Sequence, residues 1–191
     1  MIVEPRKPTR TLQFGAAVGQ VRLVSGLILF VYVLTHLLNH AAGIWSLAAL
    51  EQLRTPFLAV WRNPVASVLL YGALAAHVLV ALRAIWLRDS LRSSSVPELA
   101  QLALGLAIPL LLMNHVIGTR YAHAAFGVVD DYRYVLLNLW VFPGGQPLRH
   151  PVALLVAWGH GCIGLYLWRR FRPWFDRAAP WLLAAAVTVP T

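Results

Sequence analysis

The chain has 191 residues, of which 59% are hydrophobic and 12% are charged, and its formal net charge is +9. A soluble domain is typically about 45–50% apolar and about 25% charged, so this chain has too few charges to cover a globular surface in water. Disorder requires the opposite bias, and a basic nucleic-acid-binding face comes with a polar surface around it. The composition therefore predicts an all-α membrane protein that binds no nucleic acid.

Four segments are long and apolar enough to cross a bilayer, which takes about 20 residues at a rise of about 1.5 Å each. They are Leu23–Leu47, Pro64–Leu87, Pro97–Ile117 and Pro151–Trp168. We expect them to form a transmembrane four-helix bundle in an up-down-up-down arrangement. A shorter apolar run at 178–191 predicts the incomplete start of a fifth transmembrane helix.

This pattern divides the chain into an N-terminal segment (1–20), a four-helix domain (21–177) and the start of a further helix (178–191). Basic residues set the orientation because they concentrate in cytoplasmic loops. With the N-terminus in the cytoplasm, 11 of the 16 Lys and Arg residues lie on the inner side and 5 on the outer side. We therefore expect a multi-pass membrane protein whose N-terminal segment is cytoplasmic.

The outer segment between the third and fourth spans, 118–150, is too long for a simple turn. Its stretch Tyr132–Phe142 mixes aromatic and aliphatic residues and is followed by a Pro-Gly-Gly sequence. Aromatic residues of this kind favour the headgroup level of a bilayer. We predict an interfacial helix here that caps one end of the bundle.

Histidines are the notable ionisable residues at membrane depth, where such residues indicate function by default. The span centres lack Asp and Glu, which argues against a proton pump. One histidine on each of four adjacent helices is the pattern that two b-type haems need. Each haem iron can take two imidazoles, and the macrocycle fills the space between facing helices. The alternative is a cofactor-free anchor in which each histidine bonds to a neighbouring helix, but five without an acidic partner favour haem. The five are His36, His40, His77, His115 and His160.

Depth in the membrane pairs two of them. His77 lies 11 residues before Arg88, and His160 lies 10 residues before Arg170. At helical rise, both lie about 15 Å from the inner edge. These two histidines are therefore expected to face each other.

The partner of His115, which lies nearer the outer side, is left open between two residues of the first span. Depth favours His40, because it lies further from the inner edge than His36. Glycine spacing favours His36, because Gly26 precedes His36 by ten residues and Gly105 precedes His115 by ten. The residues alone do not decide between them.

The histidine-bearing segments are Ser25-Gly26 with His36-Leu-Leu-Asn39, His77-Val-Leu-Val-Ala-Leu-Arg83, Gly105 with His115, and His160-Gly-Cys-Ile-Gly-Leu-Tyr166. Together they resemble the dihaem cytochrome b anchors of succinate dehydrogenases and fumarate reductases. The resemblance implies two haems b as cofactors. It makes His36 and His115 the axial ligands of the outer haem iron, and His77 and His160 those of the inner one, with His40 as an alternative to His36.

A second set of segments comprises Arg22-Leu-Val-Ser-Gly26, Thr35-His-Leu-Leu-Asn-His-Ala41, Trp61-Arg-Asn-Pro64, His115-Val-Ile-Gly-Thr-Arg120, His160-Gly-Cys-Ile-Gly164 and Arg172-Pro-Trp174. These resemble the variant of the anchor found at the N-terminus of bacterial class III adenylate cyclases. The resemblance implies a bacterial cytoplasmic membrane, a homodimer, and a C-terminal cytosolic cyclase domain beyond this chain. The cyclase's metal-binding carboxylates have no counterpart here, so this chain is not expected to make cyclic AMP itself.

Two functions follow from these resemblances. The first is a dihaem cytochrome domain that senses the redox state of membrane quinones and regulates the cyclase. The alternative is an electron-transfer anchor of a succinate dehydrogenase or fumarate reductase complex, which requires separate flavin and iron–sulfur partners.

The quinone site has no direct counterpart. Some anchors have a serine four residues before the arginine that corresponds to Arg22, but this chain has Val18 there. An outer polar cluster can instead offer donors to quinone carbonyls, although it also suits an ordinary aromatic membrane interface, at which His123 and His150 are expected to be solvated. The candidates are Arg120, Tyr121, His123, Asp131 and Tyr134.

Overall fold

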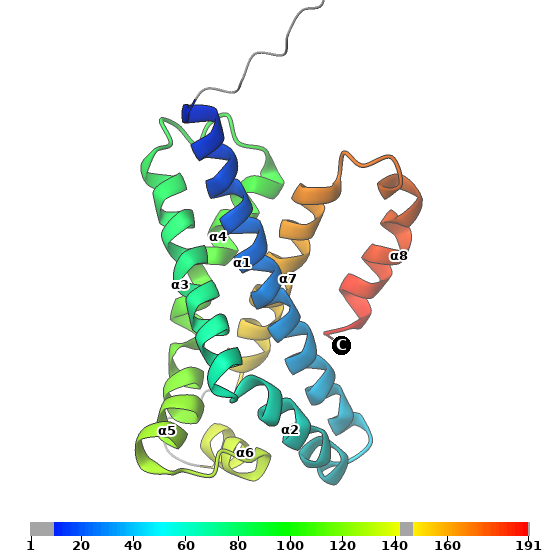
Figure 1. The fold of residues 1–191 in the computed structure, drawn as a ribbon. Coiled ribbons are helices and arrows are strands. Elements are labelled where there is room, and N and C mark those ends of the chain that lie inside the picture. The colour runs from blue at the N-terminus through cyan, green and yellow to red at the C-terminus, as the bar shows by residue number, and fades with distance from the viewer. Residues whose placement is uncertain (1–9, 142–146, 191) are drawn as a thin grey trace, which may run out of the picture.

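The computed structural model describes residues 10–141 and 147–190, and every regular element in these ranges is a helix (Figure 1). Residues 1–9 of the predicted N-terminal segment, and Phe142 at the end of the predicted interfacial helix, lie outside the described residues. The four long helices are α1 (Arg10–Ala41), α3 (Pro64–Trp86), α4 (Val96–Val116) and α7 (Arg149–Arg169).

Four helical stretches are long and apolar enough to span a membrane, as the sequence predicts. Their apolar surface is largely exposed, which suits a surface that faces lipid. This supports a membrane protein. The stretches are Ala17–Ile44, Pro64–Trp86, Val96–Phe126 and Arg149–Arg169.

Local sequence explains where two of these helices begin. At the start of α3, the side chain of Asn63 accepts a hydrogen bond from the Val65 amide at 2.9 Å, and Pro64 occupies the first turn. At the start of α4, the carboxylate of Glu98 accepts from the Ser95 amide at 3.0 Å. Both arrangements satisfy amide groups that have no partner inside the helix.

The third span is longer than the sequence predicts. Helix α4 continues through a π-helical turn, η2 (Ile117–Tyr121), into the short helix α5 (Ala122–Phe126). It ends at Gly127, whose φ of +67° is a left-handed conformation that favours glycine. The predicted end at Ile117 is therefore wrong, because backbone hydrogen bonding continues through the π-helical turn into α5, whose alanines favour a helix.

The long helices pack most closely as two pairs, α1 with α3 and α4 with α7, and α1 also contacts α7. Between α1 and α7, the rings of Phe30 and Trp158 stack with their centroids 5.3 Å apart. Few apolar side chains in the described residues are buried. They are Leu37, Ala42, Leu50, Ala73, Ala153 and Trp158.

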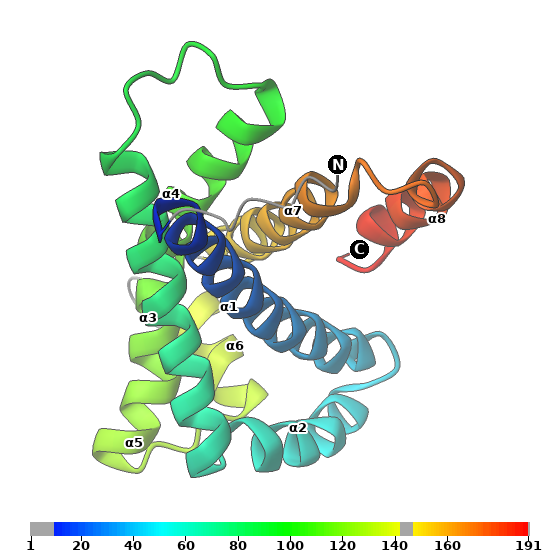
Figure 2. The same cartoon turned by 45° about the horizontal axis from the view of Figure 1, so that its top comes forward.

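The short helices that follow α1 and α4 lie at one end of the molecule. Figure 1 shows the start of α1 and the α3–α4 and α7–α8 connections at the opposite end from α2 (Leu47–Trp61), α5 and α6 (Tyr132–Trp140). The predicted interfacial helix corresponds to α6, whereas α2 is not predicted from the sequence. Helix α8 (Phe175–Thr188) begins three residues before the predicted position and packs against α7, away from α3 (Figure 2).

Candidate cofactor site

The structure brings four of the predicted histidines together as two pairs. The rings of His36 on α1 and His115 on α4 have centroids 6.0 Å apart, at an interplanar angle of 65°. The rings of His77 on α3 and His160 on α7 have centroids 6.2 Å apart, at 86°. Each pair therefore joins two helices, and together the two pairs use all four long helices.

Glycines on α1 and α4 face the second pair. A Cβ atom at Gly26 would lie 3.1 Å from Cε1 of His77, and one at Gly105 would lie 2.8 Å from Cε1 of His160. Both distances are too short for an ordinary contact, so these two positions make room for the imidazoles.

The same glycines explain the ten-residue spacing in the sequence. Ten residues of helix span about 15 Å, so α1 and α4 each carry a glycine at the level of the His77–His160 pair and a histidine at the level of the other pair. The glycine spacing thus corresponds to the distance along α1 and α4 between the two histidine pairs. The ring that faces His115 belongs to His36.

Main-chain carbonyl groups hold the His77–His160 pair. Nδ1 of His77 lies 3.3 Å from the Arg22 carbonyl oxygen and 3.2 Å from Ser25 Oγ. Nδ1 of His160 lies 3.0 Å from the Gln101 carbonyl oxygen. Because a carbonyl oxygen only accepts, both rings are expected to carry their proton on Nδ1, which leaves the lone pair on Nε2. In His160 this Nε2 lies 3.4 Å from the side-chain nitrogen of Gln101.

Other histidines surround the His36–His115 pair instead. Nε2 of His40 lies 3.1 Å from Nε2 of His36, and Nε2 of His150 lies 3.2 Å from Nδ1 of His115. Nδ1 of His36 is buried and has no hydrogen-bond partner among the described residues. His150 is half-buried against His115, which differs from the predicted solvated position.

The ring separations fit two imidazoles that bind one metal ion from opposite sides. With metal–nitrogen distances of about 2.0–2.1 Å, such rings have centroids about 6 Å apart. Metal-binding histidines also commonly donate their other ring N–H to a carbonyl group, and Nδ1 of His77 and of His160 each lies within hydrogen-bond distance of a carbonyl oxygen. In the described residues, no three or more His, Cys, Asp or Glu side chains are placed to hold one ion. A metal held by either pair would need further ligands from outside these side chains.

Two further glycines near His160 lie against side chains. A Cβ atom at Gly161 would lie 2.6 Å from Cδ2 of Phe30, and one at Gly164 would lie 3.1 Å from Nε2 of Gln101. These glycines accommodate packing between helices. The Phe30 ring, which stacks on Trp158, therefore packs against α7 at Gly161, the residue after His160.

A cavity of about 170 Å³ adjoins the His36–His115 pair. His115 and His150 line it on one side, and Tyr134 and Asn138 of α6 line it on another. Amide, phenol and imidazole groups at this wall can donate or accept hydrogen bonds. A small polar headgroup is the kind of ligand that such a wall suits.

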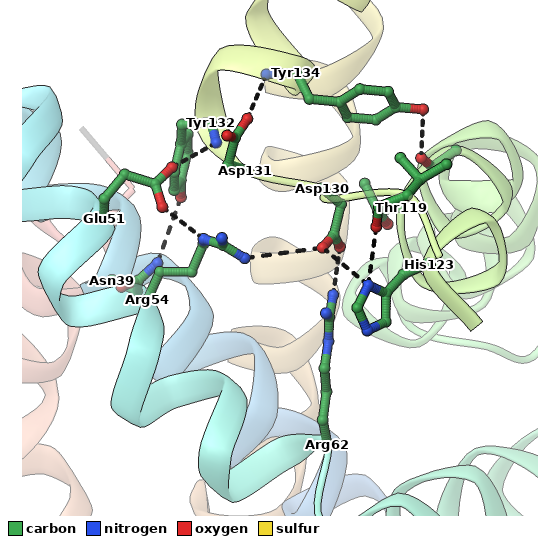
Figure 3. A network of polar contacts seen from close by, with 12 residues as sticks. Asn39, Glu51, Arg54, Arg62, Thr119, His123, Asp130, Asp131, Tyr132 and Tyr134 are labelled. Atoms are coloured by element: carbon green, nitrogen blue, oxygen red, sulfur yellow. Dashed lines mark hydrogen bonds and ion pairs between the residues drawn. The ribbon is translucent and has the colours of Figure 1, made fainter. Parts of the chain in front are cut away.

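The predicted quinone cluster does not converge on this cavity, because Tyr134 alone of the five candidates lines it among the described residues. The Tyr134 hydroxyl donates to the Gly118 carbonyl at 3.0 Å, and Asp131 accepts from the Tyr134 amide at 2.7 Å as the N-cap of α6 (Figure 3). Arg120 donates to the Tyr71 hydroxyl at 3.1 Å, and Tyr121 is exposed.

The fifth candidate, His123, belongs to a polar network that the sequence does not reveal (Figure 3). Its Nδ1 lies 2.9 Å from the Val128 carbonyl oxygen and 3.9 Å from Oδ1 of Asp130. Asp130 is buried and also pairs with Arg62 and, at 3.8 Å, with Arg54. The only signal in the sequence is the rarity of acidic residues, seven in the whole chain.

The network reaches the His36–His115 pair through α6. Glu51 binds Arg54 at 2.7 Å and accepts from the Tyr132 amide at 2.6 Å. The Tyr132 ring lies 5.1 Å from the ring of His40, and Asn39 donates to its hydroxyl at 3.5 Å. Burial raises the pKa of Tyr132, so its phenol stays protonated.

No family model, curated protein or solved structure matches this chain. The resemblance to dihaem anchors therefore depends on the segments quoted above and on the geometry of the two histidine pairs.

Proposed function

We propose that this chain is a membrane-embedded b-type cytochrome domain. In this proposal the four spans form an up-down-up-down bundle with a cytoplasmic N-terminus, and one haem b binds at each histidine pair. The observation that carries it is the separation of the rings, 6.0 Å in one pair and 6.2 Å in the other, on four different helices.

When bound, a haem b supplies a one-electron couple between ferric and ferrous iron. Two imidazole nitrogens of the protein would hold the haem iron at each site. At the inner site, the carbonyl groups of Arg22 and Gln101 orient the two rings, and Gly26 and Gly105 let them approach α1 and α4. At the outer site, His115 and His36 or His40 supply the nitrogens.

We further propose that the domain senses membrane quinones and regulates a C-terminal cytosolic adenylate cyclase. The cavity beside His115 supports a quinone headgroup there, because Tyr134, Asn138 and His150 place polar groups around it. Trp158 supports a route towards later segments, because its indole N–H donates to the Ala186 carbonyl on α8 at 2.7 Å.

A reduced-minus-oxidised spectrum with haem quantitation tests the cofactor. We expect two low-spin b-type haems per chain. His77→Ala should remove one haem and His115→Ala the other, so each variant is the control for the second site. A carefully purified chain without haem would contradict the proposal.

The choice between His36 and His40 needs a second pair of variants. We expect His36→Ala to remove the outer haem and His40→Ala to retain it, because the ring of His36 faces His115. Retention of that haem in His36→Ala, with loss in His40→Ala, would assign the ligand to His40.

The regulatory role and the alternative role as a respiratory anchor differ in their partners. The reading frame beyond Thr191 distinguishes them, because the first requires a fused cyclase domain and the second requires flavin and iron–sulfur subunits. If a cyclase follows, its cyclic-AMP production should change when the quinone pool is reduced in membranes.

A further inference from the structure

His150 is half-buried and lies beside His115. It is in the first turn of α7, and its Nε2 is 3.2 Å from Nδ1 of His115. The two ring centroids are 5.2 Å apart at an interplanar angle of 75°. The imidazoles therefore meet edge-on, in the geometry of a hydrogen bond between ring nitrogens.

The preceding residue fixes this position. Arg149 donates from Nε to the Leu111 carbonyl of α4 at 3.0 Å and from its guanidinium to the Leu110 carbonyl. The start of α7 is thereby tied to α4 one turn before His115. His150 is thus held where it meets His115.

His150 contacts Nδ1 of His115, and this choice of nitrogen indicates what His150 does. His77 and His160 place the same atom, Nδ1, against main-chain carbonyl groups. This leaves the lone pair on Nε2, which in His160 lies 3.4 Å from Nε2 of Gln101. His40, by contrast, contacts Nε2 of His36, the atom that an axial ligand would need. His150 supports the ring of its neighbour, whereas His40 competes for the coordinating nitrogen.

We propose that His150 is a positioning residue for His115. It accepts a hydrogen bond from the Nδ1–H of His115, and so fixes the tautomer whose Nε2 lone pair is available to the haem iron. The effect of this role on haem iron rests on the proposed dihaem function. The hydrogen bond itself requires only the protein chain. Within the part of the chain that the structure describes, His150 is the hydrogen-bond partner of His115 Nδ1, so a side chain on α7 takes the place that main-chain carbonyl groups have at the inner site.

An acceptor at Nδ1 makes the ligating imidazole more basic and stabilises ferric over ferrous iron. Loss of such a partner changes metal affinity by about 10-fold or more. If the loss falls on the ferric form, a 10-fold change raises the one-electron potential by about 59 mV. The inner haem, whose ligands have their own carbonyl partners, should not change.

The test uses the full chain, purified in detergent, with His150→Leu and His150→Gln. The glutamine can accept a hydrogen bond through its side-chain oxygen, so it should restore what leucine removes. In His150→Leu, redox titration should show the outer haem with a potential raised by about 59 mV, or that haem alone should be lost. The inner haem is the internal control, and Ser25→Ala is the matched variant that should affect the inner haem instead.

A second measurement does not depend on haem. In haem-free protein labelled with ¹⁵N-histidine, the ring nitrogen shifts of His115 should report a proton on Nδ1, and His150→Leu should change that tautomer balance while His150→Gln keeps it. Unchanged potentials, spectra and ring nitrogen shifts in His150→Leu would overturn the role of His150. Absence of haem from the unsubstituted chain, with the expected nitrogen shifts, would instead overturn the dihaem proposal and leave the hydrogen bond established.

Discussion

The two histidine pairs have nearly the same ring separation but very different surroundings. Carbonyl oxygens of Arg22 and Gln101 hold His77 and His160, so their rings are fixed to the backbones of α1 and α4. His36 and His115 have other histidines as neighbours and a cavity beside them. Two histidine pairs of similar geometry are thus held by the backbone in one case and by side chains in the other.

This difference has a functional meaning under the proposed function. A site held by backbone groups changes only when helices move, whereas a site held by side chains responds to a ligand in the adjoining cavity. We therefore expect the inner site to be structural and electronically constant, and the outer site to respond to quinone. The predictions that follow test this contrast.

The largest expected effect is at the rigid site. Gly105→Ala should abolish haem binding by the His77–His160 pair, because the new Cβ atom would lie 2.8 Å from Cε1 of His160. That ring is also bonded to Gln101 on the same helix as Gly105, so it has little freedom to move away. Haem quantitation should fall from two per chain to one.

A matched glycine provides the control for this loss. A Cβ atom at Gly72 on α3 has nothing within 4 Å, so Gly72→Ala should keep both haems. Two haems of unaltered spectrum in Gly105→Ala would show that the inner site is adjustable too, and the contrast between the pairs would fail.

The second prediction concerns the aromatic stack along α1 and α7. Trp158 is buried and contacts Phe30 on α1 and Ala186 on α8. Trp158→Ala should lower the free energy of unfolding by about 3 kcal/mol, because it leaves a cavity and removes the packing between helices. Thermal unfolding in detergent measures this loss, and Trp181→Ala, at a position that is 79% exposed, is the control.

The stack also tests whether the two levels are independent. If it couples them, Trp158→Ala should broaden the optical bands of both haems at temperatures where the bundle is still folded. If only the bands of the inner haem broaden, the outer site does not depend on the Phe30–Trp158 stack.

The third prediction concerns the polar network around Asp130, at the end of the molecule near the His36–His115 pair. Asp130→Asn should destabilise the protein by about 2 kcal/mol, because a buried carboxylate that neutralises Arg54 and Arg62 is lost. Asp89→Asn, at an exposed position, should have little effect. In Asp130→Asn the outer haem should dissociate at a lower temperature than the inner one. Equal loss of both haems would show that the network supports the whole bundle.

The sequence predicts the part of this arrangement that follows from helical periodicity and hydropathy. Four helical stretches long and apolar enough to span a membrane occur at the long apolar runs, and His77 and His160 meet as their depths indicate. Their ligand role stays a prediction. The ten-residue spacing from Gly26 to His36 also carried real information, but its meaning required knowledge of which helices face each other.

The remaining features depend on contacts between distant segments. Asp130 and Arg62 are 68 residues apart, and His115 and His150 are 35 apart. In each pair the two residues lie on different segments, so helical periodicity and composition do not predict that they are in contact. The end of the third span was missed for a different reason, since hydropathy falls after Ile117 while the backbone hydrogen bonding continues through a π-helical turn.

The smallest effect is expected at the cap of α6, and it tests how far the adjustable site depends on this helix. Asp131 accepts a hydrogen bond from the Tyr134 amide at 2.7 Å, and its loss in Asp131→Ala should cost about 1 kcal/mol in local helix stability. Because α6 carries Tyr134 and Asn138 into the cavity wall, fraying should weaken quinone-driven reduction of the outer haem while dithionite still reduces both haems. Ser46→Ala, which removes the equivalent cap at 3.0 Å on α2, is the matched control and should leave quinone-driven reduction unchanged. If both variants reduce at the same rate as the unsubstituted chain, the cavity beneath α6 is not where the quinone acts, and the response of the outer site must come from elsewhere.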